Sequence, residues 1–191
     1  QTCALPIWNW AASISAGGTP GAANSRLAVL PSIPALFINE VLPVNAATNQ
    51  DNFGEYDPWI ELYNASSQPI DLSGKHLSDS IGDPTRWAFP SGTTLCGGCW
   101  LLVWVDADAA QGPPPVERPL HTSFALDPLG GFIGLFTASG SLIDYVNYDE
   151  LPADHAWGRF PDGTAELRLL SLVTPEAAND APISRLDRKS T

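Results

Sequence analysis

Basic residues are scarce in this sequence. Its 191 residues include 9 lysines and arginines against 21 aspartates and glutamates, which gives a formal net charge of −12 and a pI near 4.3. Proteins that bind nucleic acid without regard to sequence use lysine and arginine to neutralise phosphates, and anionic membrane surfaces attract the same residues. We therefore expect neither nucleic acid nor an anionic membrane surface as a partner.

Long apolar runs and uninterrupted helical windows are also missing. No stretch reaches the roughly 18 apolar residues that a membrane-spanning helix requires, so we expect no membrane insertion. The 18 prolines and 16 glycines are spread along the chain and leave little room for helix interiors. The best helical window, residues 106–111, is followed by Gly112 and three prolines. One helical turn is the most that we expect there.

The common catalytic motifs are absent as well. There is no HExxH motif, no GxSxG motif and no phosphate-binding glycine loop. The 3 histidines each stand beside a polar turn, at His76, His121 and His155. We expect them at the surface or rim of the fold. The sequence therefore predicts a protein that is not an enzyme.

One pair of carboxylates could still be read as catalytic. Glu61 and Asp57 are acidic residues of the kind that glycosidases use as acid and base. Glu61, however, lies in the middle of a strand-like run, where pairing with a cation such as Arg86 explains it better. We expect this ion pair rather than acid-base chemistry.

What the sequence does contain is a series of short strand-like runs separated by turn signals. They span residues 36–42, 58–63, 99–105, 130–136 and 140–148. In the second run, Trp59, Glu61 and Tyr63 alternate with residues of the opposite face of a sheet. Several such strands predict an all-β sandwich or barrel, and seven tryptophans provide apolar area for its core. The core residues that we expect are Trp59 or Ile60, Leu62, Leu77, Trp87, Phe89, Leu102, Trp104, Phe124, Leu135 and Val146.

An acidic loop precedes the strand-like run at 58–63. Its polar side chains are Asp51, Asn52, Glu55 and Asp57. Calcium prefers several carboxylate and carbonyl oxygens on a loop of this kind. The spacing does not match the EF-hand pattern, so a calcium site and a solvated acidic loop both stay open. Asp79 and Asp83 are a second candidate pair of ligands.

The motif Cys96-Gly97-Gly98-Cys99 has three interpretations. It could be half of a zinc site, although no second CxxC or HxxxH completes four ligands. A thioredoxin-like role is disfavoured because a strand, not a helix, follows the motif. A disulfide across the turn, in an oxidising compartment, and two free thiols are the other interpretations. A disulfide here closes a very small loop, so its entropic stabilisation should be modest.

A short internal sequence repeat predicts the domain organisation. Residues 19–25 read TPGAANS and residues 174–180 read TPEAAND, an offset of 174 − 19 = 155 residues. We interpret residues 1–25 as the end of a preceding copy, 26–34 as a linker and 35–180 as one complete domain, followed by a disordered tail at 181–191. Tandem copies are typical of modular surface proteins.

The two ends of the chain fit neither a strand nor a linker. The segments QTCALPI (1–7) and DRKST (187–191) both resemble translations of a short-read sequencing adapter. We interpret them as adapter-derived, so that the chain is a metagenomic fragment and Cys3 carries no biological meaning. An ordinary disordered tail is the other interpretation.

Taken in order, the motifs of residues 36–180 resemble the lamin tail domain in its bacterial form. They are FINEVLPVN, GEYDPWIELYN, PIDLSGKHLSD, RWAFPSGTTL, WLLVWVD, LHTSFALDPLGGFIGLF, SGSLIDYVNY, GRFPDG and TPEAAN. The resemblance implies an immunoglobulin-like β-sandwich of two antiparallel sheets. Three residues depart from it: Gly97 and Cys99 stand where the family more usually has Pro and Gly, and Glu176 replaces a usual Gly.

The same resemblance implies a function. Bacterial lamin tail domains look like accessory modules of secreted or surface proteins. We expect a non-catalytic binding or spacer module, located outside the cell or on its surface. Its partners would be a protein or a cell-surface polysaccharide, and neighbouring copies of the same domain. The alternative is an accessory domain of a larger hydrolase or spore-coat-kinase-like enzyme. No cofactor is expected, apart from calcium at the acidic loop.

Overall fold

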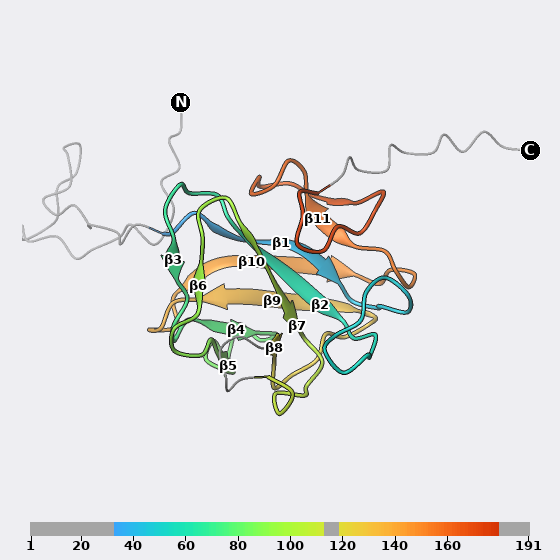
Figure 1. The fold of residues 1–191 in the computed structure, drawn as a ribbon, viewed down its shortest axis with the longest axis horizontal. Helices are drawn as coiled ribbons and strands as arrows, with labels where there is room; N and C mark the ends of the chain where they lie inside the picture. Colours follow the sequence, from blue (N-terminus) through green and yellow to red (C-terminus); the bar gives the residue numbers. More distant parts are fainter. Residues whose placement is uncertain (1–32, 113–118, 180–191) are drawn as a thin grey trace, which may run out of the picture. The chain divides into compact units, whose positions relative to one another are not determined.

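The structure, a computed structural model, describes residues 33–112 and 119–179, and all regular structure in these ranges is β-strand (Figure 1). The strands are β1 (Leu36–Leu42), β2 (Trp59–Asn64), β3 (Ile70–Asp71), β4 (His76–Ser78), β5 (Trp87–Ala88), β6 (Thr94–Leu95), β7 (Trp100–Trp104), β8 (Leu120–His121), β9 (Gly130–Phe136), β10 (Leu142–Asp149), β11 (Trp157–Arg159) and β12 (Leu167–Leu169). No helix that could cross a membrane occurs in the described ranges. The predictions for residues 1–25, for the linker up to residue 32 and for the tail at 181–191 fall outside them.

The strands form two large sheets. One has the order β12-β11-β1-β2-β7-β8 and the other the order β10-β9-β4-β5, while β3 and β6 make a small separate ladder. In Figure 1, β2 and β7 cross in front of β9 and β10. Every pairing is antiparallel except that between β7 and β8. The predicted all-β sandwich is confirmed.

The core lies between the two sheets. The first sheet contributes Ile38, Ile60, Leu62 and Val103, and the second contributes Leu77, Ile133, Leu135 and Val146, all of them fully buried. The predicted core is confirmed at every position but one. Leu102 is only partly buried and packs against a second cluster, formed by Leu42, Trp59, Trp104 and Ala156. The alternation of β2 explains both clusters, because its even-numbered side chains point between the sheets and its odd-numbered ones point outward.

The outward face of the first sheet is covered by the chain itself. Residues 174–179, here called the closing segment, lie against β1 and β2. Thr174 donates through its hydroxyl to Glu40 Oε2 (3.0 Å), and the backbone N–H of Glu176 donates to Glu61. Asn179 donates to the backbone oxygens of Asn39 and Arg159, at 3.1 and 2.8 Å. The closing segment thereby buries polar side chains that alternation alone would leave in water.

Glu61 does not pair with Arg86, so that prediction is wrong. Glu61 is fully buried beneath the closing segment and accepts a hydrogen bond from the backbone of Glu176. Arg86 instead pairs with Asp79. The prediction failed because it treated the outward face of β2 as solvent-exposed.

The motifs PIDLSGKHLSD and RWAFPSGTTL are each divided between two strands. Residues 71–79 end β3 and contain β4, and residues 86–95 contain β5 and β6. The division occurs at turns: Lys75 N donates to Leu72 O at 2.9 Å, and Thr93 N donates to Pro90 O at 3.2 Å. These turns carry the chain from the β3-β6 ladder into the second large sheet and back.

Candidate functional site

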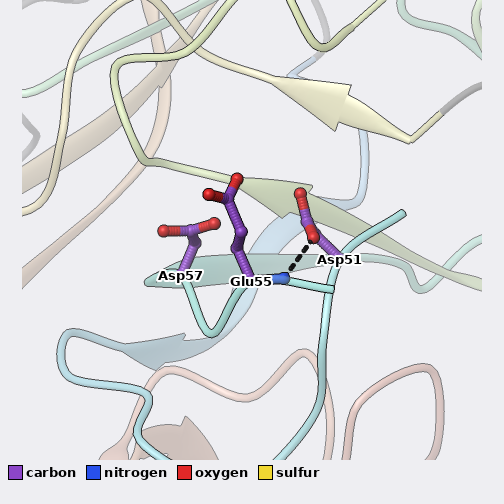
Figure 2. A group of neighbouring side chains, drawn as sticks. All are labelled: Asp51, Glu55 and Asp57. Carbon is purple, nitrogen blue, oxygen red and sulfur yellow. Dashed lines mark hydrogen bonds between the residues drawn. The ribbon is translucent and has the colours of Figure 1, made fainter. Parts of the chain in front are cut away.

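The acidic loop before β2 is folded around Asp51. Its Oδ1 accepts hydrogen bonds from the backbone N–H groups of Phe53 and Glu55, both at 2.8 Å. Gly54 completes the bend at φ +84°, a conformation that favours glycine. The bend returns the chain beside Asp51, so that Glu55 and Asp57 follow on the same side of the loop (Figure 2).

The three carboxylates of this loop form one group, here called the acidic cluster. One ligand oxygen from each of Asp51, Glu55 and Asp57 lies within 4.8 Å of the other two. Among residues 33–112 and 119–179, no other set of three or more His, Cys, Asp or Glu side chains meets this criterion. Asp79 and Asp83 therefore do not belong to such a group, and Asp79 is paired with Arg86.

A second loop, residues 106–112 after β7, approaches the acidic cluster and is here called the facing loop. Gln111 Nε2 donates to Glu55 Oε2 at 2.8 Å and to Asp108 Oδ2 at 3.0 Å. The predicted limit of one turn agrees with this loop, which is non-helical and closes with turn-type bonds such as Gln111 N to Asp108 O (3.0 Å). The facing loop thus brings further acidic and amide groups to the cluster.

His121 lies beneath these two loops, and its predicted surface position is wrong. Its side chain is fully buried. Nδ1 donates to Asp106 Oδ2 at 2.5 Å, because an ionised carboxylate can only accept, and Nε2 lies 3.0 Å from Asn52 Oδ1. The parallel pairing of β8 with β7 causes the burial, since it sets His121 beside Trp104 with the rings stacked 6.2 Å apart. His76 and His155 are partly exposed, as predicted.

Negative charge is concentrated at the cluster. Burial raises the pKa of the Asp57 carboxyl, and the charges of Asp106, Asp51 and Glu55 raise it further. Within the part of the chain that the structure describes, the ion pairs of these carboxylates involve only His121, with Asp106 at 2.5 Å and Asp51 at 3.9 Å. The fold therefore holds several carboxylates together with little compensating positive charge.

A second buried acidic pair lies under the closing segment. Burial raises the pKa of Glu40 to about 7 and that of Glu61 to about 9, and the charge of Glu40 adds to the shift of Glu61. Sequence reasoning missed this pair and the facing loop. Asp106 and Asp108, which follow the strand-like run at 99–105, could have indicated the facing loop, because strand ends meet at the rim of a sandwich. Nothing in the local sequence signalled the burial of Glu40.

The structure joins Cys96 and Cys99 by a disulfide, with their Cα atoms 5.3 Å apart. The chain turns tightly here, and Cys99 N donates to Cys96 O at 3.3 Å. A Cβ atom at Gly97 would lie 2.5 Å from the carbonyl carbon of Ser67, so only glycine fits that position. The close approach accounts for the departure from the usual proline.

A groove of about 630 Å³ lies beside the acidic loop. Its lining includes Asp51 and Asn52 of the acidic loop, together with Leu102, Trp104 and Glu176. The acidic loop therefore borders the groove, which runs over the outward face of β7.

Comparison with known families gives one match. The family model described as the Lamin Tail Domain matches residues 31–150. The matched region includes the acidic cluster, the facing loop and His121, and it ends before β11, β12 and the closing segment. No curated protein matches the chain.

Proposed function

Because this chain belongs to the lamin tail domain family, whose immunoglobulin-like fold is generally a non-catalytic module, we propose that it is a binding or spacer module of a modular secreted or cell-surface bacterial protein. The proposal makes the sandwich a rigid scaffold and assigns recognition to its loops and exposed faces. Loops held on a stable β-framework commonly carry binding functions.

The single observation that carries the non-catalytic part is the environment of His121. In a hydrolytic triad, a carboxylate orients the histidine and its Nε2 faces a nucleophilic hydroxyl or thiol. Here Asp106 contacts Nδ1, but Nε2 faces the side-chain amide of Asn52. An amide is not a nucleophile, and the fully buried ring offers no approach to a substrate. This pair is better suited to holding loops together.

The buried glutamates support the same proposal. A carboxyl with a raised pKa can serve as a catalytic acid when a substrate can reach it. Glu40 and Glu61 are both fully buried, and both accept hydrogen bonds from the closing segment. Their raised pKa values accompany structural burial beneath the chain's own backbone.

The partners that we propose are a protein or a cell-surface polysaccharide, and neighbouring copies of the same domain. The net charge of −12 is the reason for leaving nucleic acid out, because phosphates would be repelled. The extracellular or surface location is proposed on the same family resemblance and on the CxxC disulfide, since disulfides persist in oxidising compartments.

The test combines a turnover assay with a binding assay. The purified chain is incubated with model esters, phosphomonoesters, glycosides and peptides, and in parallel a fluorescent form is titrated with isolated bacterial cell walls. We expect no turnover, with saturable binding for a recognition module or none for a spacer. Turnover that is lost in His121→Gln would overturn the proposal. His155→Gln is the matched control, because His155 is partly exposed and outside the Asp106 contact.

A further inference from the structure

Two buried oxygen atoms at the acidic cluster lack hydrogen-bond partners. Asp51 Oδ2 is one of them, and the Asp51 side chain is fully buried. The other is Gln111 Oε1, on the amide whose nitrogen donates to Glu55. A buried oxygen without a donor destabilises the fold, because it has lost its hydration without gaining a hydrogen bond. Asp51 is a member of the acidic cluster, and Gln111 comes from the facing loop and contacts Glu55 of the cluster through its amide nitrogen.

The spacing of the carboxylates fits a single ion. Calcium binds oxygen at about 2.3–2.6 Å, so two of its ligands can lie up to roughly 5 Å apart. The chosen oxygens of Asp51, Glu55 and Asp57 lie within 4.8 Å of one another. Figure 2 shows the three carboxylates on the same side of the loop, where a common ion could contact all of them.

We propose that the acidic cluster and the facing loop form a calcium site, with Asp51, Glu55 and Asp57 as carboxylate ligands and Gln111 as a carbonyl ligand. Asn52, predicted from the sequence as a fourth ligand, has its side-chain oxygen against His121 Nε2. Its place in the donor set is taken by Gln111, which comes from the other loop.

The donor chemistry favours calcium over zinc and magnesium. Structural zinc sites in proteins are built from Cys and His, and both ring nitrogens of His121 are engaged by Asp106 and Asn52. Magnesium requires near-ideal octahedral geometry at about 2.0–2.1 Å, while calcium accepts irregular sets of six to eight oxygens. Three carboxylates and an amide oxygen from two loops form an irregular, oxygen-only set.

Binding would tie the two loops together at one rim of the sandwich. The contact of Gln111 with Glu55 is a direct protein link between these loops, and an ion would add a stronger one. Extracellular calcium modules bind with dissociation constants of about 10⁻⁴ to 10⁻³ M. Calcium would therefore fill the site in the organism only if the protein is extracellular, as proposed above. Calcium binding to the purified chain does not depend on that location.

The test is isothermal titration of the chelator-treated full chain with calcium chloride, together with thermal melts. We expect saturable binding of one ion and a rise in Tm of about 5 °C in excess calcium. Glu55→Gln and Asp57→Asn should each weaken the affinity at least tenfold. Both side chains are at least partly exposed, so both variants should fold, which far-UV circular dichroism checks.

The matched control is Asp149→Asn, which removes one exposed carboxylate far along the chain and should bind calcium as the unaltered chain does. Magnesium chloride at equal concentration should raise the Tm less than calcium. The inference is overturned by absence of saturable binding up to about 10 mM calcium, by equal binding in all variants, or by equal stabilisation with magnesium. None of these results would bear on the absence of catalysis, which the turnover assay tests separately.

Discussion

Glu40 on β1 lies directly opposite Glu61 on β2, and both side chains are fully buried. Directly opposed residues of like charge destabilise a sheet. The fold avoids this cost by keeping protons on the pair: burial and mutual repulsion raise the pKa of Glu61 to about 9, and burial raises that of Glu40 to about 7. The closing segment donates hydrogen bonds to both carboxyls.

The free energy of unfolding should therefore fall as the pH rises. Both folded-state pKa values exceed the value of 4.5 for an ordinary Glu, so the stabilisation is complete below pH 4.5 and is lost as the pH rises through about 7 and about 9. Glu61→Gln keeps a neutral side chain at every pH. Between about pH 5 and pH 9 the unaltered chain should lose about 5 kcal/mol more stability than this variant, measured by urea unfolding, because each unit by which the pKa is raised corresponds to about 1.4 kcal/mol.

The control for this experiment is Glu150→Gln. Glu150 is exposed, so its removal changes the net charge equally without touching the buried pair. It should leave the pH dependence of the unaltered chain intact. Parallel stability curves for the unaltered chain and Glu61→Gln would contradict the assignment.

Replacing Glu176 by glycine should stabilise the domain. The backbone of Glu176 has φ +58°, a left-handed conformation that costs a non-glycine residue about 1–2 kcal/mol. Its side chain is exposed, and the N–H that donates to Glu61 is retained in glycine. Glu176→Gly should raise the free energy of unfolding by about 0.5–1 kcal/mol after the entropic cost of glycine.

Its neighbour provides the control. Ala177 is exposed, and its φ is not positive. Ala177→Gly should lower the stability by about 0.5–1 kcal/mol, because glycine gains nothing there. Equal effects of the two substitutions in chemical denaturation would refute the explanation.

His121→Ala should destabilise the fold by about 3 kcal/mol, because Asp106 would keep a buried carboxylate without its partner. Guanidinium unfolding followed by tryptophan fluorescence measures the loss. His155→Ala should change the stability by less than about 0.5 kcal/mol, since His155 makes only an exposed contact with Ala153 O. A loss below about 1 kcal/mol for His121→Ala would show that the ion pair contributes little.

The disulfide between Cys96 and Cys99 predicts how many thiols of the unreduced chain react with an alkylating reagent. Of the 3 cysteines, Cys96 and Cys99 are bonded, so alkylation of the denatured, unreduced chain should modify Cys3 alone. In Cys3→Ser no thiol should react before reduction. Replacing both Cys96 and Cys99 by serine should cost at most about 2 kcal/mol, because the closed loop is so short. Three reactive thiols in the unreduced chain would rule out the bond.

Strand positions were readable from the sequence because alternation is a local property. The run predicted at 58–63 appears as Trp59–Asn64, and the runs at 36–42 and 130–136 appear with the predicted bounds. The sequence did not show which outward faces are covered. Glu61 is buried by a residue 115 positions away, and His121 is buried because β8 adds to β7 in parallel.

The acidic cluster could be predicted from the sequence for the same local reason. The contribution of the facing loop to it could not. Asp51, Glu55 and Asp57 lie within a single loop, so their proximity follows from a short turn. Gln111 comes from the loop after β7, 56 residues beyond Glu55. Only the pairing of β7 with β2 brings these loops to the same rim.

The closing segment also sets the order in which the domain can be completed. Contacts that span 134 and 140 residues join it to β1, so the first strand is not fully buried until nearly the last described residue has been synthesised. Contacts so distant in sequence form slowly, since the chain loses much entropy before they stabilise it. During translation, Glu40 and Glu61 remain hydrated and ionised. The final docking of residues 174–179 then raises the pKa of both carboxyls, most of all that of Glu61, which couples the end of folding to proton uptake.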